Sequence, residues 1–318
     1  MSSKKKKHHY LPQFYVGSFS NEKKEVYVFD KETGKTSKQG KKGTFHLKHF
    51  YSVDFSKHKA RSPESIKKLQ KILGIENVDT SHVKEYPDMI EDLLGESESI
   101  AAKVINKLSL NEKISDLDKN ELSTFIALMY ARTPTFREFS IKIEKELYEA
   151  SMAKIFSSKE KMVSIYDRMK KDGYTKEFDA DELLKFYKEK RYRIEIPQEL
   201  IIQNMLMVVP MIDKIIYEKT WLILEAPPNS SGFVTSDNPV FLFHSQKNEL
   251  SKTGFETPDV EIVFPLSKKC LLLMKSTPNG KAVLRKRIPQ NEVTGLNNLI
   301  MANSGKYIIS SNESSLSL

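Results

Sequence analysis

The order of secondary structure that the sequence predicts constrains the fold most: a β-rich start, a long helical block and a β-rich end. Residues 25–40 are typical of a hairpin, because the β-rich run EVYVFD is followed by the turn KETG and a returning segment. Apolar residues recur at helical spacing through residues 62–217, and short apolar runs typical of strands follow from residue 218. Two separate β ends would each bury little apolar surface. We therefore predict an α+β fold in which both ends build one mixed sheet and the helical block is inserted between them.

Local signals place several boundaries inside the helical block. Ser62 and Pro63 combine an N-cap with a proline at the first helical position, so a helix is predicted from Ser62. Further helices are predicted from about residue 87 to 108, from near residue 118 to about 152 with a break at Pro134, and from 196 to about 217. Residues 158–192 are typical of two short, charged, mostly exposed helices.

Length and composition are those of a globular protein. The chain has 318 residues, of which 39% are hydrophobic and 29% charged, so it is not typical of a disordered protein. We predict a single domain over residues 1–318, with an N-terminal β and histidine segment at 1–61 and a C-terminal β-rich part at 218–318. The longest apolar runs are shorter than a membrane span, and no apolar segment follows the basic start, so we expect a cytoplasmic protein without a membrane partner. The single cysteine, Cys270, excludes an internal disulfide.

The net charge of +9 favours an anionic partner. Many of the lysines cluster in the N-terminal third, at residues 4–7 and 35–42. This clustering favours nucleic acid or a nucleotide as the partner. The alternative is a lysine-rich surface that is merely well solvated.

The first twenty residues are too rich in rings to be a solvated tail. His8 and His9 precede Tyr10 and Phe14, and aromatic side chains gain free energy only when they dock. Adjacent residues of an extended segment point to opposite faces, so one imidazole at most is expected to face a given pocket. The two readings are a proton-transfer or metal site, and one packed histidine beside one exposed histidine. His46 and His49 are further candidates for a histidine cluster, and the alternative is that both are packing residues beside aromatic side chains.

A second polar group lies at the corner Thr235–Pro239, between two apolar runs. Turn formation alone explains Asp237 and Asn238, because both side chains bond their own backbone. The functional reading makes Asp237 a carboxylate that orients an imidazole, binds a cation or positions water. Ser236 would be a nucleophile only with a base in reach, and no G-x-S-x-G elbow is present.

A third group is the pair Arg132 and Arg137 around the predicted break at Pro134. Guanidinium groups beside a broken helix suit a phosphate or a carboxylate. The alternative is that Arg132 braces the kink through backbone carbonyls. By contrast, Glu91, Glu96 and Glu98 are expected to form a solvated helix face.

If one sheet unites both ends of the chain, the N-terminal histidines and the Ser236 corner meet in space. A divalent cation, Mg²⁺ or Mn²⁺, is then a candidate cofactor, with His8, His9 and Asp237 as candidate ligands. The sequence contains no Walker loop, G-x-G-x-x-G or H-E-x-x-H motif.

Three segments together resemble a known family. HHYLPQFYVGSF at residues 8–19, ARTPTFR at 131–137, and FVTSDNPV with IVFPLS at 233–240 and 262–267 are similar to segments of the bacterial domain-of-unknown-function family 4238. The sequence departs from the family's opening at Val16, where leucine is usual. The resemblance spans residues 8 to about 310 and implies one unit but no activity. The matching positions are His8, His9, Pro12, Gln13, Arg132, Ser236, Asp237 and Pro239.

The leading hypothesis is a phosphoesterase or nuclease-like enzyme acting on nucleic acid or nucleotides. The expected roles are general acid or base for His8 or His9, orientation or cation binding for Asp237, phosphate binding for Arg132, and substrate contacts for Gln13 and Asn238. The alternative is a non-catalytic nucleic-acid- or partner-binding module of a bacterial defence or stress system. In that case the histidines and Asp237 form a structural latch.

Overall fold

The computed structural model describes residues 7–40, 45–52, 89–177, 179–244, 249–250, 254–278 and 280–316. The chain divides into two compact units. The larger consists of Met1–Arg137 together with Ile202–Leu318, and the smaller spans Glu138–Ile201. The helix expected from Ser62 lies outside the described residues.

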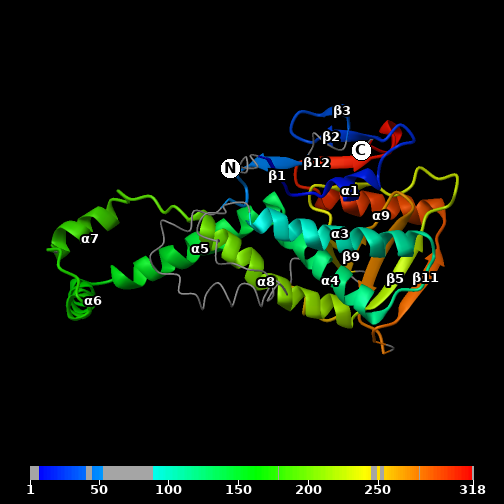
Figure 1. Cartoon of the computed structure of the whole chain (residues 1–318). Coiled ribbons are helices and arrows are strands. Elements are labelled where there is room, and N and C mark those ends of the chain that lie inside the picture. Colours follow the sequence, from blue (N-terminus) through cyan, green and yellow to red (C-terminus); the bar gives the residue numbers. More distant parts are fainter. Residues whose placement is uncertain are drawn as a thin grey trace, which may run out of the picture. The chain divides into compact units, whose positions relative to one another are not determined.

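The described strands of the larger unit form three sheets. One pairs β1 (Lys7–His9) with β4 (His46–Lys48). A four-stranded sheet has the order β3 (Lys35–Gly40), β2 (Glu25–Asp30), β12 (Tyr307–Ser310), β6 (Thr235–Ser236). A six-stranded sheet has the order β11 (Val283–Arg287), β5 (Thr220–Glu225), β10 (Cys270–Lys275), β9 (Glu261–Pro265), β7 (Phe241–His244), β8 (Glu249–Leu250). Neighbours pair antiparallel except β11 and β5, which are parallel (Figure 1).

The helices follow the predicted order. The larger unit holds α1 (Gln13–Gly17), α3 (Met89–Ser109), α4 (Asp116–Ala131), the start of α5 (Pro134–Ile155), most of α8 (Gln198–Glu218), α9 (Gln290–Asn303) and a 3₁₀ turn (Glu313–Leu316). Ser115 caps α4, because its hydroxyl accepts the Asp118 N–H while the Asp118 carboxylate accepts the Ser115 N–H. The expected break at Pro134 is present, since α4 ends at Ala131 and α5 begins at Pro134.

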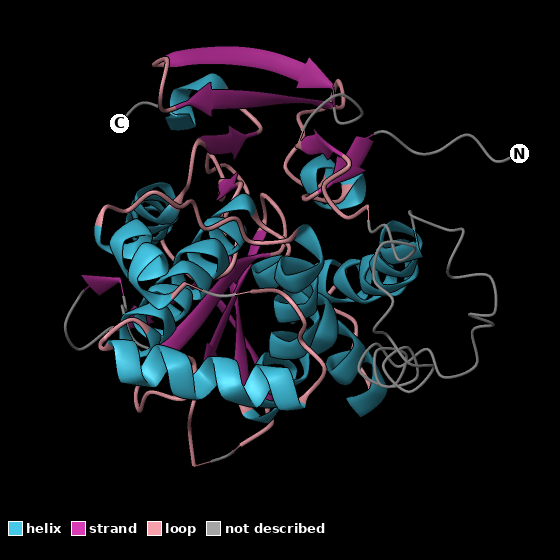
Figure 2. Ribbon diagram, turned by 90° about the vertical axis from the view of Figure 1, so that its left-hand side faces the viewer, coloured by secondary structure: helices cyan, strands magenta, loops and turns pink. Residues whose placement is uncertain are grey.

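The central strands of the six-stranded sheet are buried on both faces, which explains why β5, β9 and β10 are nearly continuous apolar runs. Trp221 and Ile223 of β5 pack in a core with residues of α3, α4 and α8. Leu224, from the opposite face of β5, packs in a second core with Val293 and Ile300 of α9. Figure 2 shows helices on both sides of these strands.

The four-stranded sheet unites the two ends of the chain, as predicted. β12 pairs with β2 on one side, with Ile309 opposite Val28, and with β6 on the other, with Ile308 opposite Ser236. The α+β class and the inserted helical block are therefore confirmed. The expectation of one sheet for all strands is corrected, because β5, β7, β9 and β10 contribute apolar residues to both cores and build a separate helix-covered sheet.

The smaller unit contains most of α5 and the helices α6 (Lys159–Lys171) and α7 (Ala180–Lys188). Ser158 and Asp179 cap α6 and α7 by accepting backbone N–H bonds. Of the two helices, only Met162 and Ala180 are buried. The prediction of two short, mostly exposed helices in residues 158–192 is confirmed.

By length and composition, α8 is the one helix of the described chain that could cross a membrane. Its apolar residues were expected to be too few for a span, on the evidence of the short run MLMVVPM. Core helices pass the same test, and Ile202, Val209 and Ile216 of α8 lie in the core. The helix is therefore weak evidence for a membrane, and the cellular location stays a prediction.

Candidate functional site

The register of β1 against β4 sends the two N-terminal histidines to opposite faces. His8 pairs with Leu47, and His9 pairs with His46. Because directly paired residues share a face, His9 and His46 lie on one side and His8 lies on the other. His8 is fully buried, whereas the His9 side chain is 20% exposed. The prediction that one imidazole at most faces a given pocket fits this arrangement.

His8 is a packing residue that ties β1 to the segment after β4. The backbone N–H of Tyr51 donates to His8 Nδ1 at 2.9 Å. The two rings are stacked, with centroids 5.8 Å apart and planes 12° from parallel. Since Nδ1 accepts this bond, the proton of the neutral imidazole resides on Nε2. This geometry corresponds to the latch role rather than to proton transfer.

Lys7, His9, His46 and Lys48 share the other face of the β1–β4 ladder, and we call this set the His–Lys face. The rings of His9 and His46 have centroids 5.6 Å apart. Burial, followed by the neighbouring His46, lowers the pKa of His9. Burial, followed by the charge of Lys7, lowers the pKa of His46. Both imidazoles are therefore biased toward the neutral form, in which one ring nitrogen accepts a proton.

Glu91 of α3 and Gln13 of α1 flank the His9 ring. Glu91 Oε1 lies 4.0 Å from His9 Nδ1 and accepts the His9 backbone N–H at 3.3 Å. Gln13 Nε2 lies 3.3 Å from His9 Nε2. If the Gln13 amide donates there, the His9 proton resides on Nδ1 and faces Glu91. The second oxygen of Glu91 is buried without a hydrogen-bond partner in the described part of the chain, and burial raises the pKa of Glu91.

Arg132, directly after α4, is a buried residue that links α3 to the β1 strand at His9. Its side chain is 1% exposed and donates to Glu98 Oε1 at 2.7 Å and to the His9 carbonyl at 2.5 Å. Tyr51 Oη donates to the Arg132 carbonyl at 3.0 Å. Although burial opposes the charge, contacts with Tyr51 and Glu98 raise the pKa of Arg132. Glu98 and the His9 carbonyl occupy the two Nη groups, whereas the buried Nε has no hydrogen-bond partner among the described residues, and the phosphate contact expected of Arg132 stays a prediction.

Arg137 has different surroundings from Arg132. Its guanidinium lies 5.0 Å from the centroid of the Phe50 ring, and burial lowers its pKa. The Arg137 guanidinium thus lies over Phe50 while that of Arg132 pairs with Glu98, Tyr51 acts on the pKa of both, and the substrate contact expected of Arg137 stays a prediction.

The Asp237 corner is held by hydrogen bonds to the turn before β12. Asp237 Oδ1 accepts the Gly305 N–H at 2.9 Å, and Oδ2 accepts the Lys306 N–H at 2.7 Å. Burial raises the pKa of Asp237, against the effect of these backbone bonds. The buried Ser236 hydroxyl accepts the Asn238 N–H at 3.2 Å. All these bonds are those of a structural turn.

Asn238 completes the corner by a reciprocal amide contact. Its Nδ2 donates to the Asn303 carbonyl at 3.1 Å, and Asn303 Nδ2 donates to the Asn238 carbonyl at 2.9 Å. This pair ties the corner to the end of α9. Asn238 thereby has a structural role, and the substrate contact expected of it stays a prediction.

The corner approaches the N-terminal segment at two tyrosines: Tyr15 Oη lies 2.7 Å from Thr235 Oγ1, and burial and then the charge of Asp237 raise the pKa of Tyr10. The predicted meeting of the corner with the histidines themselves stays a prediction. Within the residues described, however, no group of three or more His, Cys, Asp or Glu side chains is placed to hold a metal ion. His8, His9 and Asp237 therefore do not form the metal site for which they were candidates.

Sequence reasoning missed Glu91 and Glu98, which were assigned to a solvated face. Both turn toward the N-terminal segment, where they contact His9 and Arg132. Their spacing of seven residues was the available signal, because it places two side chains on the same face of a helix.

Comparison with known proteins identifies a family. A family model described as "Protein of unknown function (DUF4238)" matches residues 7–314. Neither the curated proteins nor the solved structures include a match to this chain.

Proposed function

The chain belongs to the DUF4238 family, whose function is unknown, and we propose from its own residues that it is a phosphoester-cleaving enzyme acting on nucleic acid or nucleotides at the His–Lys face. The observation that carries this proposal is the β1–β4 register, which puts two imidazoles and two ammonium groups on one face. The net charge of +9 favours polyanionic substrates.

The chemistry follows from the properties of these side chains. Neutral His9 accepts a proton from the attacking water or hydroxyl while that oxygen bonds to phosphorus. The phosphorus–oxygen bond of the leaving group breaks, and the leaving oxygen takes up a proton from water. Lys7 and Lys48 stabilise the negative charge of the phosphate oxygens. Imidazole suits this role because its pKa lies near neutrality.

Glu91 is a positioning residue in this proposal, in place of Asp237. Its carboxylate lies beside His9 Nδ1 and favours the tautomer in which Nε2 accepts the proton. Its buried and unpartnered oxygen is a costly feature for a fold to keep. Perturbed pairs of titratable groups of this kind are typical of acid–base sites.

The test is cleavage of end-labelled single-stranded RNA and DNA, and hydrolysis of nucleotides, with EDTA, magnesium or manganese as separate arms. His9→Ala should lower the cleavage rate by about 10²-fold or more, with the melting temperature preserved. His244→Ala is the matched control, because His244 ends β7 of the six-stranded sheet. Wild-type protein that cuts none of these substrates in any arm contradicts the proposal.

A second candidate function is binding without cleavage. The observation that favours it is that His8, Arg132 and Asp237 all make structural hydrogen bonds, as a latch would. The His–Lys face would then contact phosphates only through charge. Retention of labelled RNA or DNA on a filter by the wild type, without cleavage of either, would favour this function. The Lys7→Ala variant should then retain less of the nucleic acid.

A further inference from the structure

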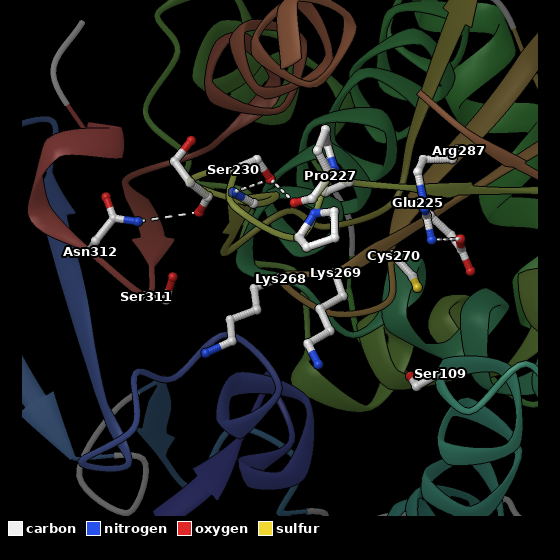
Figure 3. A pocket seen from close by; sticks show the side chains of 14 residues that line it. Ser109, Glu225, Pro227, Ser230, Lys268, Lys269, Cys270, Arg287, Ser311 and Asn312 are labelled. Carbon is white, nitrogen blue, oxygen red and sulfur yellow. Dashed lines mark hydrogen bonds and ion pairs between the residues drawn. The ribbon is translucent and has the colours of Figure 1, made fainter. Parts of the chain in front are cut away.

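A pocket of about 450 Å³ opens at one end of the six-stranded sheet, where strands β5 and β10 end and begin. It is lined by the loop from Ala226 to Gly232, the turn at Lys268–Cys270, Arg287 of β11, and Ser311 and Asn312 after β12 (Figure 3). All these residues belong to the larger unit. None belongs to the His–Lys face.

The pocket has an excess of positive charge. Lys268, Lys269 and Arg287 line it together with one carboxylate, that of Glu225. Arg285 already pairs with this carboxylate, with Nη1 2.5 Å from Glu225 Oε1. Arg287 is held loosely, at 3.9 Å from Glu225 Oε2, and its side chain is 68% exposed. Three cations therefore face the pocket, while its one carboxylate is neutralised by a fourth.

These cations keep donors for a ligand. Lys268 Nζ donates to the Ser20 carbonyl at 2.8 Å, which uses one of the three ammonium protons. The backbone N–H of Lys269 donates to Ser267 Oγ at 3.2 Å, while its Nζ has no hydrogen-bond or ion-pair partner among the described residues. Figure 3 shows Lys268 and Lys269 extending side by side, with Arg287 and Glu225 beyond Cys270.

The walls of the pocket are fixed before any ligand binds. Gly232 adopts φ +75°, and a Cβ on it would lie 2.3 Å from the Lys268 carbonyl oxygen. The Phe233 N–H donates to this same oxygen at 2.8 Å, and the Ala226 N–H donates to the Lys269 carbonyl at 2.9 Å. Asn312 Nδ2 donates to the Ser231 carbonyl at 3.2 Å. A pocket built this way loses little conformational entropy on binding.

We propose that this pocket binds a phosphate-bearing small molecule of nucleotide size. The volume lies within the range of small-molecule sites. Arginine and lysine are the side chains that bind phosphate oxygens most strongly. Pro227 and Pro228 add an apolar surface on which a ring can pack. The site stands apart from the proposed function, because it requires neither His9 nor cleavage.

The test is isothermal titration of the full chain with adenosine monophosphate, adenosine, inorganic phosphate and a 5′-phosphorylated oligonucleotide, at about 0.15 M salt. The monophosphate should bind and adenosine should not. Lys269→Ala and Arg287→Ala should each weaken binding about tenfold. Lys286→Ala is the matched control, because it removes the same charge from the neighbouring position of β11, which points to the opposite face.

The arms separate the sources of the phosphate. Stronger binding of the oligonucleotide assigns the pocket to nucleic-acid ends, and stronger binding of the monophosphate assigns it to free nucleotides. His9→Ala should bind as wild type does, so that a failure of the proposed activity leaves this site testable. Absence of binding by all phosphate ligands, or an equal loss in Lys286→Ala, overturns the proposal.

Discussion

Asp237 and Gly305 are fitted to one another. The Asp237 carboxylate accepts the Gly305 N–H at 2.9 Å, and a Cβ on Gly305 would lie 3.0 Å from that carboxylate. The Lys306 N–H satisfies the second oxygen at 2.7 Å. Asp237 therefore links the end of β6 to the turn that precedes β12 by two hydrogen bonds.

Asp237→Ala should lower the free energy of unfolding by about 2 kcal/mol, because two partly buried backbone N–H groups lose their charged acceptor. Urea denaturation at neutral pH measures this loss. Glu32→Ala is the control, since Glu32 is an exposed partner of Lys306 and should change stability by about 0.5 kcal/mol at most. A variant that unfolds at the same urea concentration as wild type would show that the latch contributes nothing.

Glu98→Gln should destabilise the protein by about 3 kcal/mol, because it leaves the buried Arg132 guanidinium without its carboxylate. The matched control is Glu96→Gln on the same helix, where the side chain is exposed. The two variants change charge equally, so thermal or urea unfolding of both separates the loss of the buried ion pair from a general charge effect. Equal midpoints would contradict the bracing role of Arg132.

Much of the fold could be predicted because its signals are local. The hairpin at 25–40, the break at Pro134 and the apolar strand at Trp221 each follow from turn chemistry, proline geometry or periodicity. The division of the strands into separate sheets could not be predicted. It depends on which helix covers which face, as when Trp221 and Leu224 of one strand enter different cores.

The site was predictable in part. Pairing of the chain ends brought Tyr10 near Asp237, as the sheet argument required. Which imidazole faces outward depends on the β1–β4 register, and no periodicity in a three-residue strand fixes that register. Glu91 was missed because a carboxylate on a helix is usually solvated, and only tertiary packing buries it beside His9.

Gly232→Ala should destabilise the protein by more than about 2 kcal/mol, because the methyl group would overlap the Lys268 carbonyl oxygen and φ is positive. Gly34→Ala is the control: its φ is +66°, but nothing lies within 4 Å of the added carbon. That variant should lose about 1 kcal/mol from the left-handed backbone alone. Denaturant unfolding of both variants measures the difference. Equal losses of unfolding free energy would mean that the turn at Lys268 moves away from the added methyl group without destabilising the fold.

The depressed pKa of His9 predicts a specific pH dependence of stability. Burial, followed by His46, lowers this pKa in the folded protein, whereas histidine in the unfolded chain titrates near 6.5. Below about pH 6.5 the unfolded chain therefore binds a proton that the folded protein disfavours, so the contribution of His9 is full above that pH and is lost as the pH falls. The raised pKa values of Asp237 and Glu91 act in the opposite direction, since their ionisation costs stability as the pH rises above about 4.

A comparison of wild type with His9→Gln isolates the histidine, because both proteins retain the carboxylates and His46. The free energy of unfolding of wild type should fall relative to that of the variant as the pH falls from about 7.5 to about 5.5, since only wild type loses the His9 contribution in that window. Urea unfolding across this range measures the two curves. The same titration predicts that any cleavage using His9 as a base declines on the acid side. Parallel stability curves would mean that the His9 imidazole is no harder to protonate in the fold than in the unfolded chain.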